Sequence, residues 1–198
     1  MKRIIFLSFC LAFVYSIGIS QTIKLNVTEE TTMTVSGTST LHDWSSEVNK
    51  ITGIVEVGEK MIDKGKAKKG DAIKNVRIIV PVTSIVSQRG ATMDKKTYKA
   101  LKSEEHPEIL FALTDNNVFS ANGNTFIVNA NGDLTIAGIK REVEFPVEGK
   151  IISADKVSFT GSYTLNMIDY EMEPPSAMFG QIVTGEEIEI KFELIVSQ

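Results

Sequence analysis

The chain has 198 residues, of which 42% are hydrophobic and 23% are charged, and its formal net charge is −4. This composition is typical of one globular domain and excludes a disordered chain, a collagen-like chain and a membrane protein with several spans. A nucleic-acid-binding domain carries a basic surface, so the acidic balance argues against a nucleic acid as partner.

The first twenty residues have the pattern of an export signal. Two basic residues precede an apolar run from Ile4 to Ile19, and small residues stand three and one positions before Gln21. We therefore expect cleavage between Ser20 and Gln21. The alternative is an uncleaved N-terminal anchor, because the apolar run is close to the shortest length that spans a bilayer.

Cleavage would leave residues 21–198, which we expect to form one periplasmic or secreted domain without a transmembrane span. Removal of two basic residues leaves 19 Lys and Arg against 25 Asp and Glu, so the net charge becomes −6. Cleavage also removes Cys10, the one cysteine of the chain. The domain would then hold no disulfide and no thiolate metal site.

Alternation of apolar and polar residues dominates this domain and is typical of strands with one buried face. It predicts about eight or nine strands, near 23–27, 33–39, 51–57, 76–82, 109–113, 126–136, 143–147, 157–165 and 188–196. Pairs of turn-forming residues separate several of the apolar runs and predict tight hairpins. These pairs are Asn122-Gly123, Ala137-Gly138, Glu148-Gly149 and Thr184-Gly185.

Two segments interrupt the alternation. Residues 60–69 contain five lysines, and nearby glycines favour a solvated hairpin tip over an anion-binding patch. Residues 94–102 form the one predicted helix, with Asp94 as N-cap and with Tyr98 and Leu101 on one face.

Together these elements predict an all-β fold, a single antiparallel β-barrel of about eight strands with one short helix. Repeated alternation of strands and helices is absent, which argues against a parallel sheet. We favour a barrel over a sandwich because closure leaves no unpaired edges. Eight strands enclose an interior that side chains fill or that holds one small ligand.

Four segments, in chain order, resemble the YceI-like family of exported bacterial proteins, which includes polyisoprenoid-binding members. The resemblance implies a lipocalin-like barrel, a helix that closes one end, and a long hydrophobic cavity for an isoprenoid or another amphiphilic lipid. The lysine-rich segment and residues 169–180 depart from the isoprenoid-binding members. The segments that carry the resemblance are GTSTLHDWSSEV (37–48), MDKKTYKALKSEEHPEILFAL (93–113), NGDLTIAGIKREVEFPVEG (131–149) and FGQIVTGEEIEIKFEL (179–194).

The candidate ligand-binding residues are mostly aromatic side chains in the alternating runs, which either fill the core or line a cavity. Trp44 suits core packing or the wall of a cavity mouth, because its ring joins a large apolar area to one N–H donor. Arg89 precedes the predicted helix, where unpaired N–H groups could help to bind a phosphate head. The full set is Trp44, Phe111, Phe126, Phe145, Phe159, Tyr163, Phe192, His42 and Arg89.

Catalysis and metal binding have little support in the sequence. The chain has two histidines and no Gly-x-Ser-x-Gly motif. His42 and Asp43 are neighbours and would point to opposite faces of a strand. His106 stands before Pro107 among glutamates that we expect to form a solvated turn rather than a metal site. We expect no enzyme, no metal and no cofactor other than a bound polyisoprenoid or fatty-acid-like lipid.

The leading hypothesis is a non-enzymatic carrier of a hydrophobic small molecule, because each buried CH₂ group of a ligand contributes about 0.8 kcal/mol. The alternative is a protein-interaction or stress-response module with a filled barrel, whose loops 59–70 and 171–178 contact a partner. A third hypothesis is a hydrolase that depends on His42. Whether the protein forms a homodimer stays open.

Overall fold

The structure is a computed structural model that describes residues 21–69 and 73–198. The expected signal peptide and its cleavage therefore lie outside the described residues.

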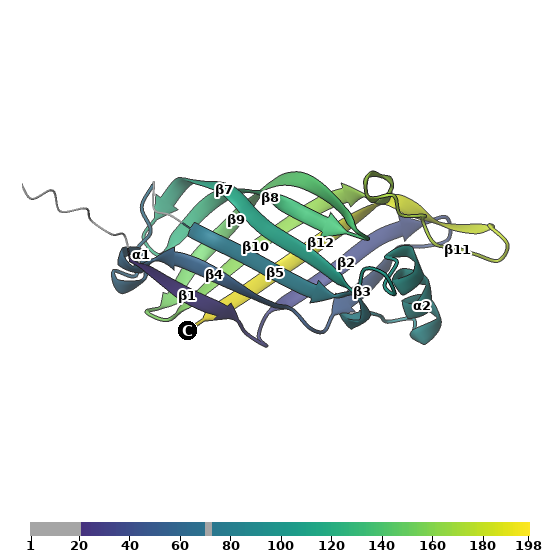
Figure 1. Cartoon of the computed structure of the whole chain (residues 1–198), viewed down its shortest axis with the longest axis horizontal. Coiled ribbons are helices and arrows are strands. Elements are labelled where there is room, and N and C mark those ends of the chain that lie inside the picture. The colour runs from purple at the N-terminus through teal and green to yellow at the C-terminus, as the bar shows by residue number, and fades with distance from the viewer. Residues whose placement is uncertain (1–20, 70–72) are drawn as a thin grey trace, which may run out of the picture.

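Eight antiparallel strands close into one barrel, and their order around the barrel follows the chain (Figure 1). Three of the eight are each interrupted by a short irregular segment. These are β1 (Thr22–Val27) with β2 (Thr32–Ser39), β3 (Trp44–Val48) with β4 (Thr52–Gly58), and β5 (Ile73–Pro81) with β6 (Ile85–Ser87). The other five are β7 (Glu108–Asn122), β8 (Thr125–Ile136), β9 (Ile139–Ser153), β10 (Lys156–Asn166) and β12 (Ile182–Ser197).

The last strand closes the barrel by pairing with the first interrupted strand. Near its C-terminus β12 pairs with β1, and nearer its N-terminus it pairs with β2. On its other side it pairs with β10 over eleven successive positions, from Ser197 with Lys156 to Glu187 with Asn166. The prediction of one antiparallel barrel of about eight strands is confirmed.

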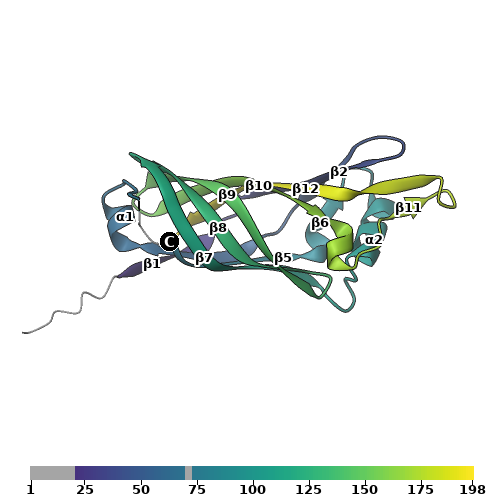
Figure 2. The same cartoon turned by 90° about the horizontal axis from the view of Figure 1, so that it is seen from above.

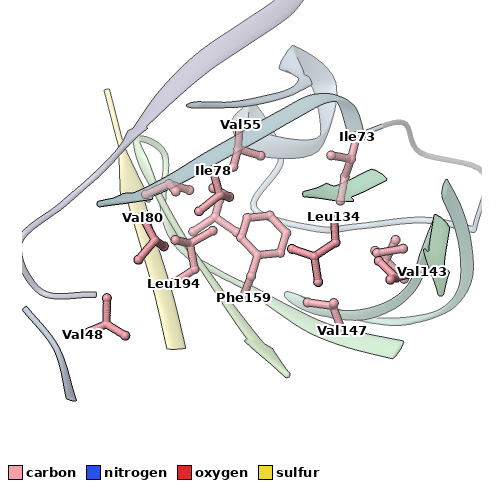
Figure 3. Close-up of a cluster of buried hydrophobic side chains, with 14 of the residues drawn as sticks. Val48, Val55, Ile73, Ile78, Val80, Leu134, Val143, Val147, Phe159 and Leu194 are labelled. Atoms are coloured by element: carbon pink, nitrogen blue, oxygen red, sulfur yellow. The ribbon is translucent and has the colours of Figure 1, made fainter. Parts of the chain in front are cut away.

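The core is the inward face of these strands. In β8 burial alternates at every position from Thr125 to Ile136, so one set of side chains faces inward and the other faces outward. Buried side chains from facing strands meet in the interior, among them Val80, Phe159 and Leu194 (Figure 3). The apolar half of each alternating run therefore forms the core.

Two of the four predicted turn pairs are wrong. Ala137 and Gly138 do form the β8–β9 turn, with φ of 50° and 83°, but Gly149 lies inside β9 and Gly185 lies inside β12. Gly149 serves packing, because a Cβ there would lie 2.1 Å from Cζ of Phe126. In this barrel a glycine marks a close approach of an aromatic ring as well as a turn.

The predicted helix exists, but it begins earlier than expected. It is α2 (Ala91–Ala100), and Gly90 with φ of 86° precedes it. Asp94 is not the N-cap, because its Oδ1 accepts a hydrogen bond from the backbone N–H of Ser87 at 2.7 Å and ties the helix to β6. The Tyr98 hydroxyl donates to the carbonyl of Thr83 at 3.0 Å. Leu101, the residue that follows the helix, is buried.

A second helix stands where the lysine-rich loop was expected. α1 (Glu59–Asp63) buries Met61 and Ile62 almost completely, so this part of the segment is an end cap rather than a solvated hairpin tip. Figures 1 and 2 place α1 at one end of the barrel and α2 at the other. The remaining elements are η1 (Val82–Ser84), η2 (Met167–Tyr170) and β11 (Ser176–Ala177).

Over the described residues, the structure contains no helix of the length and apolarity that a membrane crossing requires.

Candidate ligand-binding cavity

The barrel interior contains a cavity of about 340 Å³ at the α2 end, which we call the outer chamber. Strands β2, β3, β6 and β12, helix α2 and the segment before β11 contribute to its wall. Exposed Leu41, His42 and Arg89 are among its lining residues, so the chamber reaches the molecular surface. Its volume lies within the range of about 300–1,000 Å³ that is usual for small-molecule sites.

A second cavity of about 150 Å³, the inner chamber, lies deeper in the barrel. Its lining side chains are aliphatic or aromatic. Four residues line both chambers, namely Met33, Val80, Ile109 and Ile190, so the two chambers adjoin. The interior thus offers one path that starts at a mouth with polar groups and ends among apolar side chains.

Four of the candidate residues form an aromatic cluster along the inner chamber. The ring of Phe145 lies at the centre, with centroid distances of 5.7 Å to Phe111, 5.3 Å to Tyr163 and 6.2 Å to Phe192. All four line the chamber. They come from β7, β9, β10 and β12; the last three are successive neighbours in the barrel, and β8 lies between β7 and β9.

Phe159 also lines the inner chamber, whereas Phe126 lines neither chamber. The two rings pack edge to face, with centroids 6.0 Å apart and an angle of 83° between the planes. Phe126 is only 2% exposed. The structure therefore places Phe126 in the packed core beside the chamber, which is the packing role that the sequence left as its alternative.

The last three candidates lie together at the mouth of the outer chamber. A guanidinium nitrogen of Arg89 and Nε2 of His42 form a hydrogen bond. The indole N–H of Trp44 donates to the carbonyl of Thr38 at 3.0 Å. A basic group and an aromatic ring thus border the entrance to an apolar interior.

The His42 loop does not present a nucleophile and base pair. The Ser39 hydroxyl donates to the carbonyl of His42 at 2.6 Å and accepts from the N–H of the same residue at 3.2 Å. The imidazole is bonded to Arg89 instead. Ser39 and His42 therefore organise the loop.

Sequence reasoning missed the contribution of α2 and of the segment before β11. Met93 and Lys96 of α2 line the outer chamber, as do Met172 and Pro175. The sequence predicted the helix but did not identify which of its faces meets the cavity. Part of the segment 171–178, considered above as a protein-contact loop, also forms cavity wall.

Within the described part of the chain, no group of three His, Cys, Asp or Glu side chains is gathered as a metal site would require. The backbone N–H of His106 donates to the carbonyl of Lys102 at 2.8 Å. A Cβ at Gly138 would lie 2.5 Å from Cε1 of the His106 ring. His106 thus packs against the β8–β9 turn, where the bare glycine leaves room for its ring.

Tyr170 carries an unusual polar group in the buried core. It is 2% exposed, and among the described side chains its hydroxyl is the buried polar atom that lacks a hydrogen-bond partner. The pKa of Tyr170 is raised to about 12, mainly by burial, with a smaller upward contribution from Tyr163 and an opposing one from Arg141. The folded protein therefore favours the neutral phenol.

We expect Tyr170→Phe to keep or raise the free energy of unfolding at neutral pH, by up to about 1 kcal/mol, because it removes a buried unpaired hydroxyl. The pKa is raised on folding, so the stabilising preference for the neutral phenol is present below pH 10 and is lost as pH rises towards 12. Urea unfolding of both proteins between pH 10 and pH 12 should show that the free energy of unfolding falls less steeply with pH in the variant than in the parent. A clear loss of stability at neutral pH would contradict the unpaired state of the hydroxyl.

Comparison with known proteins shows the family to which this barrel belongs. The sequence model of the YceI-like domain matches residues 18–196. The chain belongs to the YceI-like family. A comparison with curated proteins found no match. The resemblance seen in the sequence is thereby confirmed.

Solved structures similar to this YceI-like barrel come from several bacteria. Burkholderia cenocepacia BcnA gives a TM-score of 0.63 at 16% identity, over 84% of this chain and 96% of that chain. A polyisoprenoid-binding domain from Saccharophagus degradans, implicated in plant cell wall breakdown, gives 0.65 at 9% identity, over 88% and 97%. The Campylobacter jejuni YceI protein gives 0.57 at 12% identity, over 77% and 84%. At these identities the likeness shows the shared fold.

Proposed function

We propose that this YceI-like protein is an exported, non-enzymatic carrier that binds one amphiphile, an isoprenoid or another long-chain lipid. Its apolar tail would occupy the two chambers and its polar head would lie at the mouth. The observation that carries the proposal is the adjoining pair of chambers, which runs from Arg89 and His42 into an aromatic and aliphatic interior. The polyisoprenoid-binding domain among the similar structures supports the choice of ligand class.

The tail supplies most of the binding free energy in this proposal. Each CH₂ group that leaves water contributes about 0.8 kcal/mol, so a tail binds firmly without polar contacts. The inner chamber offers the tail no charged side chain. A polar group placed there would lose its hydration without a replacement, so the head is restricted to the mouth.

The decisive experiment is extraction of the purified protein into organic solvent, followed by mass spectrometry of the extract. We expect a lipid at close to one molecule per protein, and native mass spectrometry should show the same mass added to the chain. The delipidated protein should then rebind a long-chain alcohol, detected as a change in the fluorescence of Trp44 at the mouth. An empty extract together with no binding of any long-chain amphiphile would contradict the proposal.

The head-group part of the proposal is tested with Arg89→Gln. We expect this variant to bind dodecyl phosphate about tenfold or more weakly, because a charge-assisted hydrogen bond is lost, and to bind dodecanol unchanged. Lys150→Gln is the matched control, because it removes an exposed cation from β9 near the α1 end of the barrel. An equal loss for both ligands would show that Arg89 shapes the mouth rather than contacting the head.

Export is tested at the N-terminus of the protein recovered from the producing cell. We expect a chain that begins at Gln21 and is found in the periplasm or the medium. Peptide mass spectrometry of the intact N-terminus distinguishes this result from an uncleaved anchor, which would retain residues 1–20 and sediment with membranes.

A further inference from the structure

The hairpin between β11 and β12 projects from the cavity end of the barrel, beyond α2 in both views (Figures 1 and 2). β11 pairs with the first two residues of β12, and we call the connecting residues 178–181 the hairpin tip. Phe179 at this tip is fully exposed (108%), and Met178 is 64% exposed. These are the two most apolar side chains of the connection, yet both are largely exposed to solvent.

The backbone holds these side chains outward. Met178, Phe179 and Gly180 have φ of 50°, 55° and 87° in succession. Left-handed conformations are unfavourable for residues other than glycine and persist where the surrounding structure imposes them. The N–H groups of Gly180 and Gln181 donate to the carbonyls of Ala177 and Met178, so hydrogen bonds close the turn without help from either apolar side chain.

The tip is joined to the mouth of the outer chamber. Pro175, Ala177 and Ile182 at the base of the hairpin line that chamber. The N–H of Thr40 donates to the carbonyl of Val183 at 3.0 Å, which holds the β2–β3 loop against the hairpin. That loop carries Leu41, which is 64% exposed. Four exposed apolar side chains therefore lie on the hairpin and the adjoining loop, namely Leu41, Met178, Phe179 and Val183, whereas exposed Ile152 lies on β9.

The charge of this region differs from that of the rest of the domain. Residues 174–185 contain no charged side chain, although Asp and Glu outnumber Lys and Arg in the chain. Two cations stand behind the tip: Lys96 donates to the carbonyl of Ser176 at 2.9 Å, and Arg89 lies at the mouth. A neutral apolar projection with cations behind it matches the order of layers in a bilayer, where acyl chains lie beneath phosphates.

A protein partner fits this surface less well. A stable protein interface buries about 800 Å² on each side, whereas a buried aromatic side chain contributes about 150–250 Å². Two exposed side chains on a narrow turn do not supply such an area. Insertion into a lipid surface requires only that a few apolar groups leave water.

We propose that the hairpin tip docks the cavity mouth on a lipid bilayer. Phe179 and Met178 enter the boundary between headgroups and acyl chains, and Leu41 follows at the edge of the mouth. Arg89 and Lys96 then face the phosphates of anionic lipids. Docking in this orientation brings the outer chamber against the membrane, and it does not require that a ligand already be bound.

The test is co-sedimentation of residues 21–198 with vesicles of phosphatidylcholine, with and without one quarter phosphatidylglycerol. We expect binding that is stronger to the anionic vesicles and weaker at high salt. The double variant Met178→Ser/Phe179→Ser should bind about tenfold or more weakly, because it removes the inserted apolar groups. Ile152→Ser is the matched control, because Ile152 is 50% exposed on β9 near the α1 end, and it should bind as the parent does.

Equal vesicle binding by the parent and the double variant would overturn the proposal, as would an equal loss in Ile152→Ser. Absence of vesicle binding by the parent would also overturn it, and a protein partner lost on the same double substitution would assign the tip to protein contact. Binding of dodecanol, followed by Trp44 fluorescence in the absence of vesicles, should persist in the double variant. Failure of docking is thereby distinguished from failure of the carrier function.

Discussion

Substitution of Ile190 by tryptophan should shorten the tail that the protein accepts. Ile190 lines both chambers, so a larger side chain there should block passage to the inner chamber while leaving the mouth accessible. A tail that loses the burial of three CH₂ groups loses about 2.4 kcal/mol, which corresponds to about fifty-fold weaker binding. Long n-alkyl phosphates should therefore lose affinity, and short ones should bind as before.

The matched control for this substitution is Ile127→Trp. Ile127 lies on β8 between the inward-facing Phe126 and Val128, so its side chain points to the outer face. The same change of residue there should leave the dependence of affinity on chain length unaltered. If Ile190→Trp weakens short and long ligands equally while its thermal unfolding matches that of the parent, the tail does not reach the inner chamber.

Gly149→Ala should lower the free energy of unfolding by about 1–3 kcal/mol, although it adds only one methyl group. The new Cβ would lie 2.1–2.6 Å from three atoms of the Phe126 ring. That ring is buried and fixed against Phe159, so it has no room to turn away. Alanine is otherwise no worse than glycine within a strand, because glycine loses more backbone entropy on folding.

A double-mutant cycle with Phe126→Leu isolates the contact. Phe126→Leu alone should destabilise the barrel by removing buried area. In combination with Gly149→Ala the total loss should be smaller than the sum of the two, because the shorter side chain no longer meets the methyl group. Urea unfolding of the four proteins gives the interaction energy. Strictly additive losses would show that the two positions do not touch.

The strands of this barrel were largely predictable, because the signal for a half-buried strand repeats every second residue. Runs such as 126–136 display it over many positions. The signal fails for β3 and β6, which are short and carry inward serines, Ser46 and Ser87. It also fails at α1, where two apolar residues among lysines are too few to show a helical period. Glycine was ambiguous, because a turn and a close aromatic contact both require it.

The lining of the cavity was predictable only in part. The alternation of apolar and polar residues identified Phe111, Phe145 and Phe192 as candidates, and all three line the inner chamber. Whether an interior is filled or hollow depends on the combined side-chain volumes of eight strands, which no local pattern reveals. The contact between Arg89 and His42 joins residues 47 positions apart in the chain. The hydroxyl of Tyr170 is unpaired because the fold places no hydrogen-bond partner from the described residues within reach of it. Neither has a local signature.

The pairing of the last strand with the first has a consequence for how the molecule forms. The Thr28 hydroxyl donates to the carbonyl of Ile195 across a separation of 167 residues, so the closing contacts have the longest loops to order and are expected late in folding. A chain that crosses a membrane N-terminus first cannot close its barrel until β12 has emerged. For a protein exported as we propose, the topology itself postpones completion of the fold until translocation has ended, and the segments already across remain exposed to chaperones and proteases until then.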